Sequence, residues 1–265
     1  MTSEESLTYF GYRFGPNGPH AARTIMFKDL APLLDVVPKD AGTAEYRAQI
    51  VDVNLLAKPT QVSRRLSFEY LRALYSLDPD VPLFRVLRTL YAQNPVALPQ
   101  LALLLALVRD PLLRATEDLI LDASVGEALP RSVMEQHIAT HFPDRFSPVS
   151  LTAFAQRVNG SWTQAGLLRG QARKVRSEPP VSAEAVVYAL VLARIEGATG
   201  GLLFESPWIA LLGITPATAV AFAAQASSRG IITLRNAGGV KEVSFGGLLT
   251  TDEIQRMAEP DDGTN

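Results

Sequence analysis

The chain has 265 residues, of which 47% are hydrophobic and 20% charged, so it can bury a sizeable core and is not disordered as a whole. A formal net charge of −2 excludes a polybasic protein, and the lack of cysteine excludes disulfides, cysteine-ligated metals and thiol catalysis. The N-terminus is acidic where a signal peptide is basic, and the longest apolar run, residues 101–108, is far shorter than the ~20 residues of a membrane span. These features favour a soluble cytoplasmic protein that makes no membrane contact.

The first half of the chain shows apolar residues at the three-and-four spacing of amphipathic helices. Together these helices predict a bundle over residues 24–128, preceded by an N-terminal arm, residues 1–23. Its expected core includes Leu101, Leu104, Leu105 and Val108. The predicted helices span residues 24–37, 43–56, 63–77, 82–93, 97–108 and 110–122.

Shorter elements follow Pro130, and the chain as a whole is predicted to be mainly α. Residues 129–200 are expected to form a helical domain with a basic helix-turn-helix-like segment, and residues 201–250 a winged-helix element whose wing is a C-terminal β-hairpin. Residues 251–265 form an acidic tail, and disorder is expected over residues 259–265. The predicted helices span residues 131–142, 148–158, 162–172, 182–196, 208–212 and 215–228, with a break at residues 159–161, and the strands span residues 231–235 and 240–245.

No enzyme motif is found in the sequence. It lacks a phosphate-binding loop, a dinucleotide-binding glycine motif and a nucleophile elbow. His137 and His141 are four residues apart and can share a helix face, but no third ligand is placed near them in the sequence, and a partly exposed helix surface accounts for both. We therefore expect a non-enzymatic protein without cofactor or metal.

The positive signal is a basic segment, residues 145–176, with six basic and no acidic side chains. If residues 162–172 and those that follow are helical, Arg169, Arg173 and Arg176 form one stripe, and small polar groups lie at the N-terminal end, where helix amides favour phosphate. This composition suits contact with a DNA backbone, although a solvated helix face is the alternative. The candidate DNA-contacting residues here are Arg157, Ser161, Thr163, Gln164, Arg169, Arg173, Lys174 and Arg176.

Two weaker signals lie outside this segment. The predicted recognition helix, residues 215–228, is nearly uncharged, so this element favours a structural or protein-contacting role, with Arg235 and Lys241 on the wing as further candidate DNA contacts. Arg64 and Arg65 begin a predicted helix, where they could touch phosphate or pair with carboxylates of the bundle.

Three stretches resemble the BrxA-like proteins of bacteriophage-exclusion (BREX) systems. Residues 54–60, followed by Ser63, Arg64 and Arg65, are similar to that family's N-L-L-x-K-x-[ST] segment. The leucine-rich residues 101–108 leading into 109–114, and residues 161–168, are similar to further parts of the family. The resemblance covers roughly residues 24–250.

This resemblance implies a non-enzymatic protein with a NusB-like N-terminal bundle and winged-helix elements that binds double-stranded DNA. It also implies action in phage defence beside a methyltransferase, an ATPase and phosphatase-like partners. The chain departs from the family pattern in its negative net charge and its extra C-terminal wing and tail. Two alternatives stay open: a protein–protein adaptor or scaffold within a defence complex, and a winged-helix transcriptional regulator.

Overall fold

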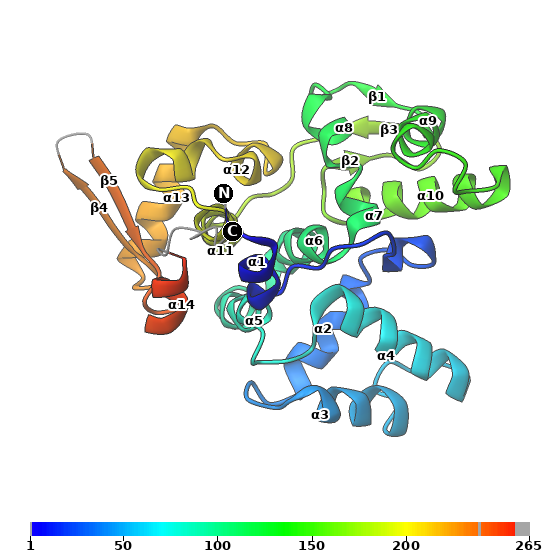
Figure 1. Cartoon of the computed structure of the whole chain (residues 1–265), viewed down its shortest axis with the longest axis horizontal. Coiled ribbons are helices and arrows are strands. Elements are labelled where there is room, and N and C mark those ends of the chain that lie inside the picture. The colour runs from blue at the N-terminus through cyan, green and yellow to red at the C-terminus, as the bar shows by residue number, and fades with distance from the viewer. Residues whose placement is uncertain (1, 238–239, 258–265) are drawn as a thin grey trace, which may run out of the picture.

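The computed structural model describes residues 2–237 and 240–257, and most of them are helical. The helices of the first half surround α6, Leu98–Arg109, whose residues are buried on every side except for part of the first turn (Figure 1). A helix that is apolar all round belongs in the centre of a protein, and the four predicted core residues of α6 are indeed all 0% exposed. The helices around it are α1 Glu4–Phe10, α2 Phe27–Val36, α3 Thr43–Arg47 (continued by a π-helical turn, Ala48–Asp52), α4 Gln61–Tyr75 and α5 Pro82–Gln93.

The predicted helix over residues 110–122 is in fact two helices, α7 Pro111–Arg114 and α8 Glu117–Asp122. Asp110 ends α6 and caps α7, because its carboxylate accepts hydrogen bonds from the backbone amides of Leu112 and Leu113. This corner falls at the predicted boundary between the helices 97–108 and 110–122. Periodicity did not reveal the break between α7 and α8, at Ala115 and Thr116.

The next unit combines α9, Arg131–His141, and α10, Pro148–Gln164, with a small antiparallel sheet. The strands are β1 Ala128–Leu129, β2 Leu168–Arg169 and β3 Lys174–Arg176, in the order β1-β3-β2. Leu168 pairs with Arg176, and Ala128 pairs with Val175. The unit lies at the upper right of Figure 1, beside the bundle.

Two sequence predictions fail in this unit. The expected break at residues 159–161 is absent, because Gly160 lets Thr24 of the N-terminal segment approach the helix closely and Ser161 is held inside by hydrogen bonds. The expected helix over residues 162–172 is wrong. Gly166 and Gly170 adopt positive φ angles of 88° and 94°, which end α10 and close the turn between β2 and β3.

The C-terminal part contains the predicted pair of helices and the hairpin. Two further helices were not expected. One is a 3-10 helix, Gly200–Glu205, and the other is α14, which the first residues of the predicted acidic tail form. Residues 238–239 of the hairpin turn and 259–265 of the tail, predicted as turn and disorder, lie outside the described residues. The elements are α11 Ala183–Ile195, α12 Pro207–Leu211, α13 Pro216–Ser228, β4 Thr233–Ala237, β5 Val240–Ser244 and α14 Thr251–Arg256.

All these parts share one hydrophobic core, which runs from Phe10 to Met257. Within the part of the chain that the structure describes, no single helix is long and apolar enough to cross a membrane, and only two sharply bent helix pairs reach the required length and composition.

A buried polar chain ties three distant segments together. His20 Nδ1 lies 2.7 Å from Asp110 Oδ2, and His20 Nε2 lies 2.7 Å from Ser161 Oγ. All three residues are 0% exposed. Gly18 has to be glycine here, because a Cβ atom would lie 1.7 Å from Asp110 Oδ1. The chain therefore fixes the N-terminal segment and α10 to the corner between α6 and α7.

The Asp110 carboxylate depends on this environment. Burial by itself raises the pKa of Asp110, but the hydrogen bonds and charge of His20 and the Leu112 amide outweigh it and leave the pKa below its ordinary value. A carboxyl group with a lowered pKa in the folded chain stabilises the fold above its unfolded pKa, and this contribution is lost as the pH falls through the folded value.

We expect Asp110→Asn to lower the free energy of unfolding by about 3 kcal/mol at neutral pH, because one amide oxygen cannot replace two accepting carboxylate oxygens. The stability difference between the variant and the wild type should narrow below about pH 4, because Asp110 then binds a proton more readily in the unfolded chain than in the folded one. Urea unfolding of both proteins, from neutral pH to below about pH 4, measures this stability difference. A constant difference at all pH values would contradict the charged role of Asp110.

Truncation of a buried side chain on the central helix α6 is expected to leave a cavity. Leu104→Ala should lower the free energy of unfolding by about 2–5 kcal/mol, because Leu104 is 0% exposed. Leu202→Ala is the matched control, since Leu202 is 62% exposed and its removal should cost under about 0.5 kcal/mol. Equal thermal melts for the two variants would remove Leu104 from the core.

Candidate nucleic-acid interface

The turn between β2 and β3 presents two arginines to solvent. Arg169 ends β2, Arg173 directly precedes β3, and both side chains are exposed. Gly170 makes this turn possible, because a Cβ atom there would lie 2.2 Å from the Arg173 carbonyl oxygen. No acidic residue occurs over residues 145–177, so the turn carries concentrated positive charge.

A polar groove of about 560 Å³ lies between this turn and the helices α9 and α10. We call it the turn groove. Lys174 lines it from the turn side. On the α9 side Arg131 lines it together with Glu135, and these two side chains form an ion pair at 2.9 Å. Its lining residues are Pro130, Arg131, Ser132, Glu135, Gln156, Asn159, Gly160, Gln171, Ala172 and Lys174.

One feature of the turn groove points to a ligand that carries a hydrogen-bond donor. Asn159 is 3% exposed, and its side-chain oxygen has no hydrogen-bond partner among the described residues. A buried acceptor without a partner costs free energy that a bound donor would recover. Lys174 donates to the Gly170 carbonyl at 2.6 Å across the turn, and partial burial lowers the pKa of Lys174.

Two predicted contacts are wrong because their side chains are buried. Ser161 is 0% exposed and hydrogen-bonded to His20 and the Ile25 amide. Arg176 is 4% exposed and donates to the Ile120 carbonyl at 3.1 Å and the Leu167 carbonyl at 3.3 Å. In a strand, Arg176 points to the opposite face from Val175, whereas the helical pattern had placed it beside Arg173.

Three further residues of the basic segment face the N-terminal part of the chain or the helix itself. Arg157 donates to the Ala21 carbonyl, and the Gln164 amide donates to Thr24 Oγ1 at 3.3 Å. Thr163 donates to the Asn159 carbonyl within α10. The structure therefore does not bring these three together with Arg169 and Arg173.

The remaining predicted contacts lie on other elements. Arg64 is half-buried and reaches the carbonyls of Lys58 and Val51 rather than a carboxylate, while Arg65 is exposed. Both belong to α4, at the lower right of Figure 1, far from the β2–β3 turn.

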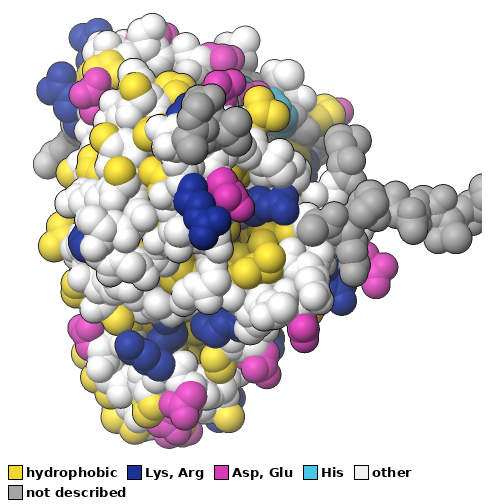
Figure 2. Space-filling model, turned by 90° about the vertical axis from the view of Figure 1, so that its left-hand side faces the viewer, with side chains coloured by type: hydrophobic (Ala, Val, Ile, Leu, Met, Phe, Trp, Pro, Cys, Tyr) yellow, Lys and Arg dark blue, Asp and Glu magenta, His cyan; other side chains and the backbone are white. Residues whose placement is uncertain are grey.

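Arg235 and Lys241 lie on the β4–β5 hairpin, where Arg235 is 4.0 Å from Glu242. Figure 2 shows the face that carries this hairpin, and its basic side chains are scattered among acidic, apolar and neutral ones. Arg229, at the end of α13, forms an ion pair with the buried Glu184. This face therefore lacks the concentrated positive charge of the β2–β3 turn.

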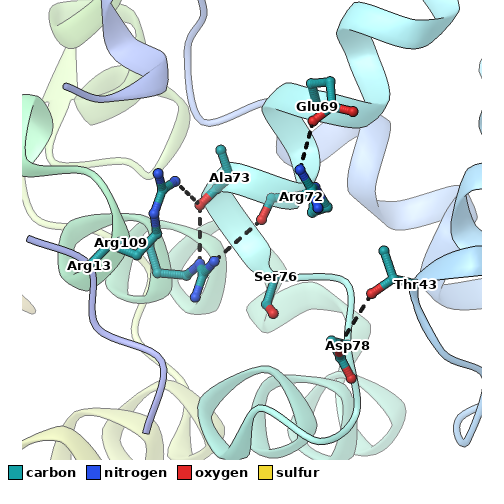
Figure 3. Close-up of a pocket in the computed structure, with 8 residues that line it drawn as sticks. All are labelled: Arg13, Thr43, Glu69, Arg72, Ala73, Ser76, Asp78 and Arg109. Carbon is teal, nitrogen blue, oxygen red and sulfur yellow. Dashed lines mark hydrogen bonds and ion pairs between the residues drawn. The ribbon is translucent and has the colours of Figure 1, made fainter. Parts of the chain in front are cut away.

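A second pocket, of about 460 Å³, collects arginines at the C-terminal end of α4 (Figure 3). Arg13 and Arg109 both donate to the Ala73 carbonyl, at 3.2 and 3.1 Å, and Arg72 pairs with Glu69 at 3.0 Å. Burial, together with the charge of Arg13, lowers the pKa of Arg109 to about 10. Arg109 also donates to the Gly11 carbonyl at 2.7 Å, so these guanidinium groups hold the N-terminal segment against the bundle.

The buried polar chain has the residue types of a serine hydrolase triad, but it cannot act as one. Ser161, His20 and Asp110 are all 0% exposed, so no substrate reaches the serine oxygen. Ser161 donates to the Arg157 carbonyl of its own helix and accepts from the Ile25 amide, which uses its hydroxyl for structure. No local pattern in the sequence indicates this contact, because the three residues are far apart along the chain.

No protein-family model matches this sequence, and no curated protein matches it. Among solved structures, the fold is similar to a crystal structure of magnesium ion-bound SspB, with a TM-score of 0.56 over 97% of this chain and 93% of that chain at 14% identity. A second crystal structure of SspB gives a TM-score of 0.53 over 96% and 92% at 12% identity. The likeness concerns the fold and extends over nearly the full length of both chains.

Arg176 and Arg173 of the β2–β3 hairpin should respond differently to truncation. Arg176→Ala should lower the free energy of unfolding by about 2–4 kcal/mol, because the buried Ile120 carbonyl loses the donor that the guanidinium supplies. Arg173→Ala should change it by less than about 0.5 kcal/mol, since that side chain is exposed. Thermal and urea unfolding of both variants measures the contrast, and equal stabilities would contradict the assignment of Arg176 as structural.

Proposed function

We propose that this protein is a non-enzymatic, double-stranded DNA-binding protein that contacts the phosphate backbone through the β2–β3 turn and the turn groove. The observation that carries the proposal is the exposed pair Arg169 and Arg173 on a tight turn, beside a polar groove that Lys174 lines, in a segment free of acidic residues. Arginine is well suited to such contacts, because its planar guanidinium forms paired hydrogen bonds with phosphate oxygens.

The order of elements supports this assignment. Helix α8, strand β1, helices α9 and α10 and the β2–β3 hairpin follow the order of a winged helix, in which the third helix enters the major groove and the hairpin wing lies on the backbone. Helix α10 takes the place of the recognition helix, and its N-terminal end projects from the molecule at the right of Figure 1. Its one charged side chain, Arg157, is bound to the Ala21 carbonyl, so the β2–β3 turn supplies the proposed backbone contacts. The order α11, α12, α13 and the β4–β5 hairpin repeats this pattern at the C-terminus, with an uncharged α13 better suited to protein contacts.

The net charge of −2 is compatible with DNA binding. At ~0.15 M salt the Debye length is ~8 Å, so the acidic C-terminal part of the sequence is largely screened from the β2–β3 turn. The local charge around Arg169 and Arg173 therefore decides the interaction with phosphate.

The biological setting we propose is phage defence. It rests on the resemblance of residues 54–65, 101–114 and 161–168 to BrxA-like proteins. In that setting the bundle around α6 is the NusB-like part, and the DNA-binding unit acts beside a methyltransferase and an ATPase.

The proposal predicts weak to moderate binding of duplex DNA with little sequence preference. Fluorescence anisotropy with two unrelated duplexes should give similar affinities and a slope of log affinity against log salt of about −3 to −4, from three or four phosphate contacts at ~0.9 each. The double variant Arg169→Glu/Arg173→Glu should bind both duplexes more weakly by at least about tenfold and show a flatter slope. Its melting temperature should stay near that of the wild type, because both side chains are exposed.

The control Arg235→Glu/Lys241→Glu makes the same change in net charge on the β4–β5 hairpin and should alter affinity much less. If the two double variants lose affinity equally, total charge rather than the β2–β3 turn governs binding. If Arg169→Glu/Arg173→Glu binds like the wild type, the proposed interface is wrong and the adaptor alternative, with the turn docked on an acidic partner, takes its place.

A further inference from the structure

Three metal-ligating side chains meet on the outer surface of the α8–α9 pair. Asp118 belongs to α8, and His137 and His141 belong to α9. One ligand atom from each lies within 4.8 Å of the others. Asp118 Oδ1 is 3.0 Å from His137 Nε2, and Asp118 Oδ2 is 3.7 Å from His141 Nε2. The sequence pattern did not indicate this group, because Asp118 belongs to a different helix from the two histidines and is distant from them along the chain.

The hydrogen bonds of the histidines prepare one nitrogen of His141 for a cation. His141 Nδ1 lies 3.1 Å from the His137 carbonyl, which can only accept, so Nδ1 carries the proton and Nε2 keeps a free lone pair toward Asp118. This is the arrangement in which an outer hydrogen bond orients a ligating imidazole. The two ring centroids lie 4.3 Å apart with the ring planes tilted by 39°, a closeness expected for positions four residues apart on one helix face.

His137 holds a proton that a cation would replace. Its Nε2 lies 2.9 Å from the Ala115 carbonyl and 3.0 Å from Asp118, so it donates toward two oxygens. Binding a metal at this nitrogen releases that proton and turns the Asp118 carboxylate to the metal.

We propose that Asp118, His137 and His141 bind a divalent transition-metal ion of the zinc class, with water as the remaining ligand. Two imidazole nitrogens and one carboxylate oxygen suit Zn²⁺, Co²⁺ or Ni²⁺, whereas Mg²⁺ prefers an all-oxygen set. The side chains are 58%, 16% and 38% exposed in the order Asp118, His137 and His141, so the ion enters directly from solvent.

The site joins two helices that are separate in sequence. Helix α8 precedes β1 and α9 follows it, so a shared metal would fix α8 to α9 and stabilise the unit that carries the β2–β3 turn. The proposal is independent of DNA binding, because none of the three ligands lines the turn groove.

The test uses the untagged full-length protein and three metal salts. Equilibrium dialysis with ZnCl₂ followed by elemental analysis should give one Zn²⁺ per chain at pH 7.5, and Zn²⁺ should raise the melting temperature. CoCl₂ should give visible d–d absorption, and MgCl₂ at the same concentration should give no shift in melting temperature.

Ligand variants locate the site. His141→Ala and Asp118→Ala should each weaken Zn²⁺ binding by at least about tenfold without lowering the melting temperature of the metal-free protein by more than a few degrees. Asp122→Ala is the matched control, since Asp122 is an exposed carboxylate on α8 outside the cluster and its loss should leave binding unchanged.

The proposal is overturned if the wild type retains no Zn²⁺ after dialysis, or if His141→Ala binds as tightly as the wild type. Equal weakening by Asp118→Ala and Asp122→Ala would also overturn it, because general attraction to negative charge would then account for the binding. His141→Ala is the decisive variant, since its side chain is the more exposed of the two histidines and the fold tolerates its loss.

Discussion

The buried chain Asp110–His20–Ser161 is the constraint on which the rest of the arrangement depends. It links the N-terminal segment, the corner between α6 and α7, and the last turn of α10 by two contacts of 2.7 Å inside the core. A buried carboxylate is tolerated only when its hydrogen bonds are complete, and here each oxygen accepts from backbone amides as well. Position and orientation of α10 therefore follow from a polar contact, and α10 in turn sets the wall of the turn groove.

Arginine serves two separate roles in this molecule. Arg88, Arg109 and Arg176 are buried and donate to backbone carbonyls, so they connect segments that lack regular pairing. Arg169 and Arg173 are exposed on a turn that glycine makes possible. The abundance of arginine is thus in part structural. The exposed pair on the β2–β3 turn, by contrast, lies beside a groove, and its guanidinium groups form no hydrogen bond or ion pair with another described residue.

The unit formed by α8, α9, α10 and the three-stranded sheet carries both proposals. Its turn groove lies between the β2–β3 turn and the helices α9 and α10, and the Asp118–His137–His141 cluster lies on the α8–α9 pair. A short sheet and three helices bury little apolar surface, so additional links between these elements stabilise such a unit. The polar chain through Ser161 supplies one such link, and a metal between α8 and α9 would supply another.

The sequence by itself determined the helical class, the central helix α6 and the β4–β5 hairpin, because apolar periodicity and turn residues act over short distances. Tertiary structure alone decided the course of residues 159–176, where α10 continues through Gly160 and a hairpin replaces the expected helix. It also decided which basic residues reach solvent, since strand geometry buries Arg176 and exposes Arg173. Contacts such as His20 with Asp110 join residues distant in sequence, and no local pattern encodes them.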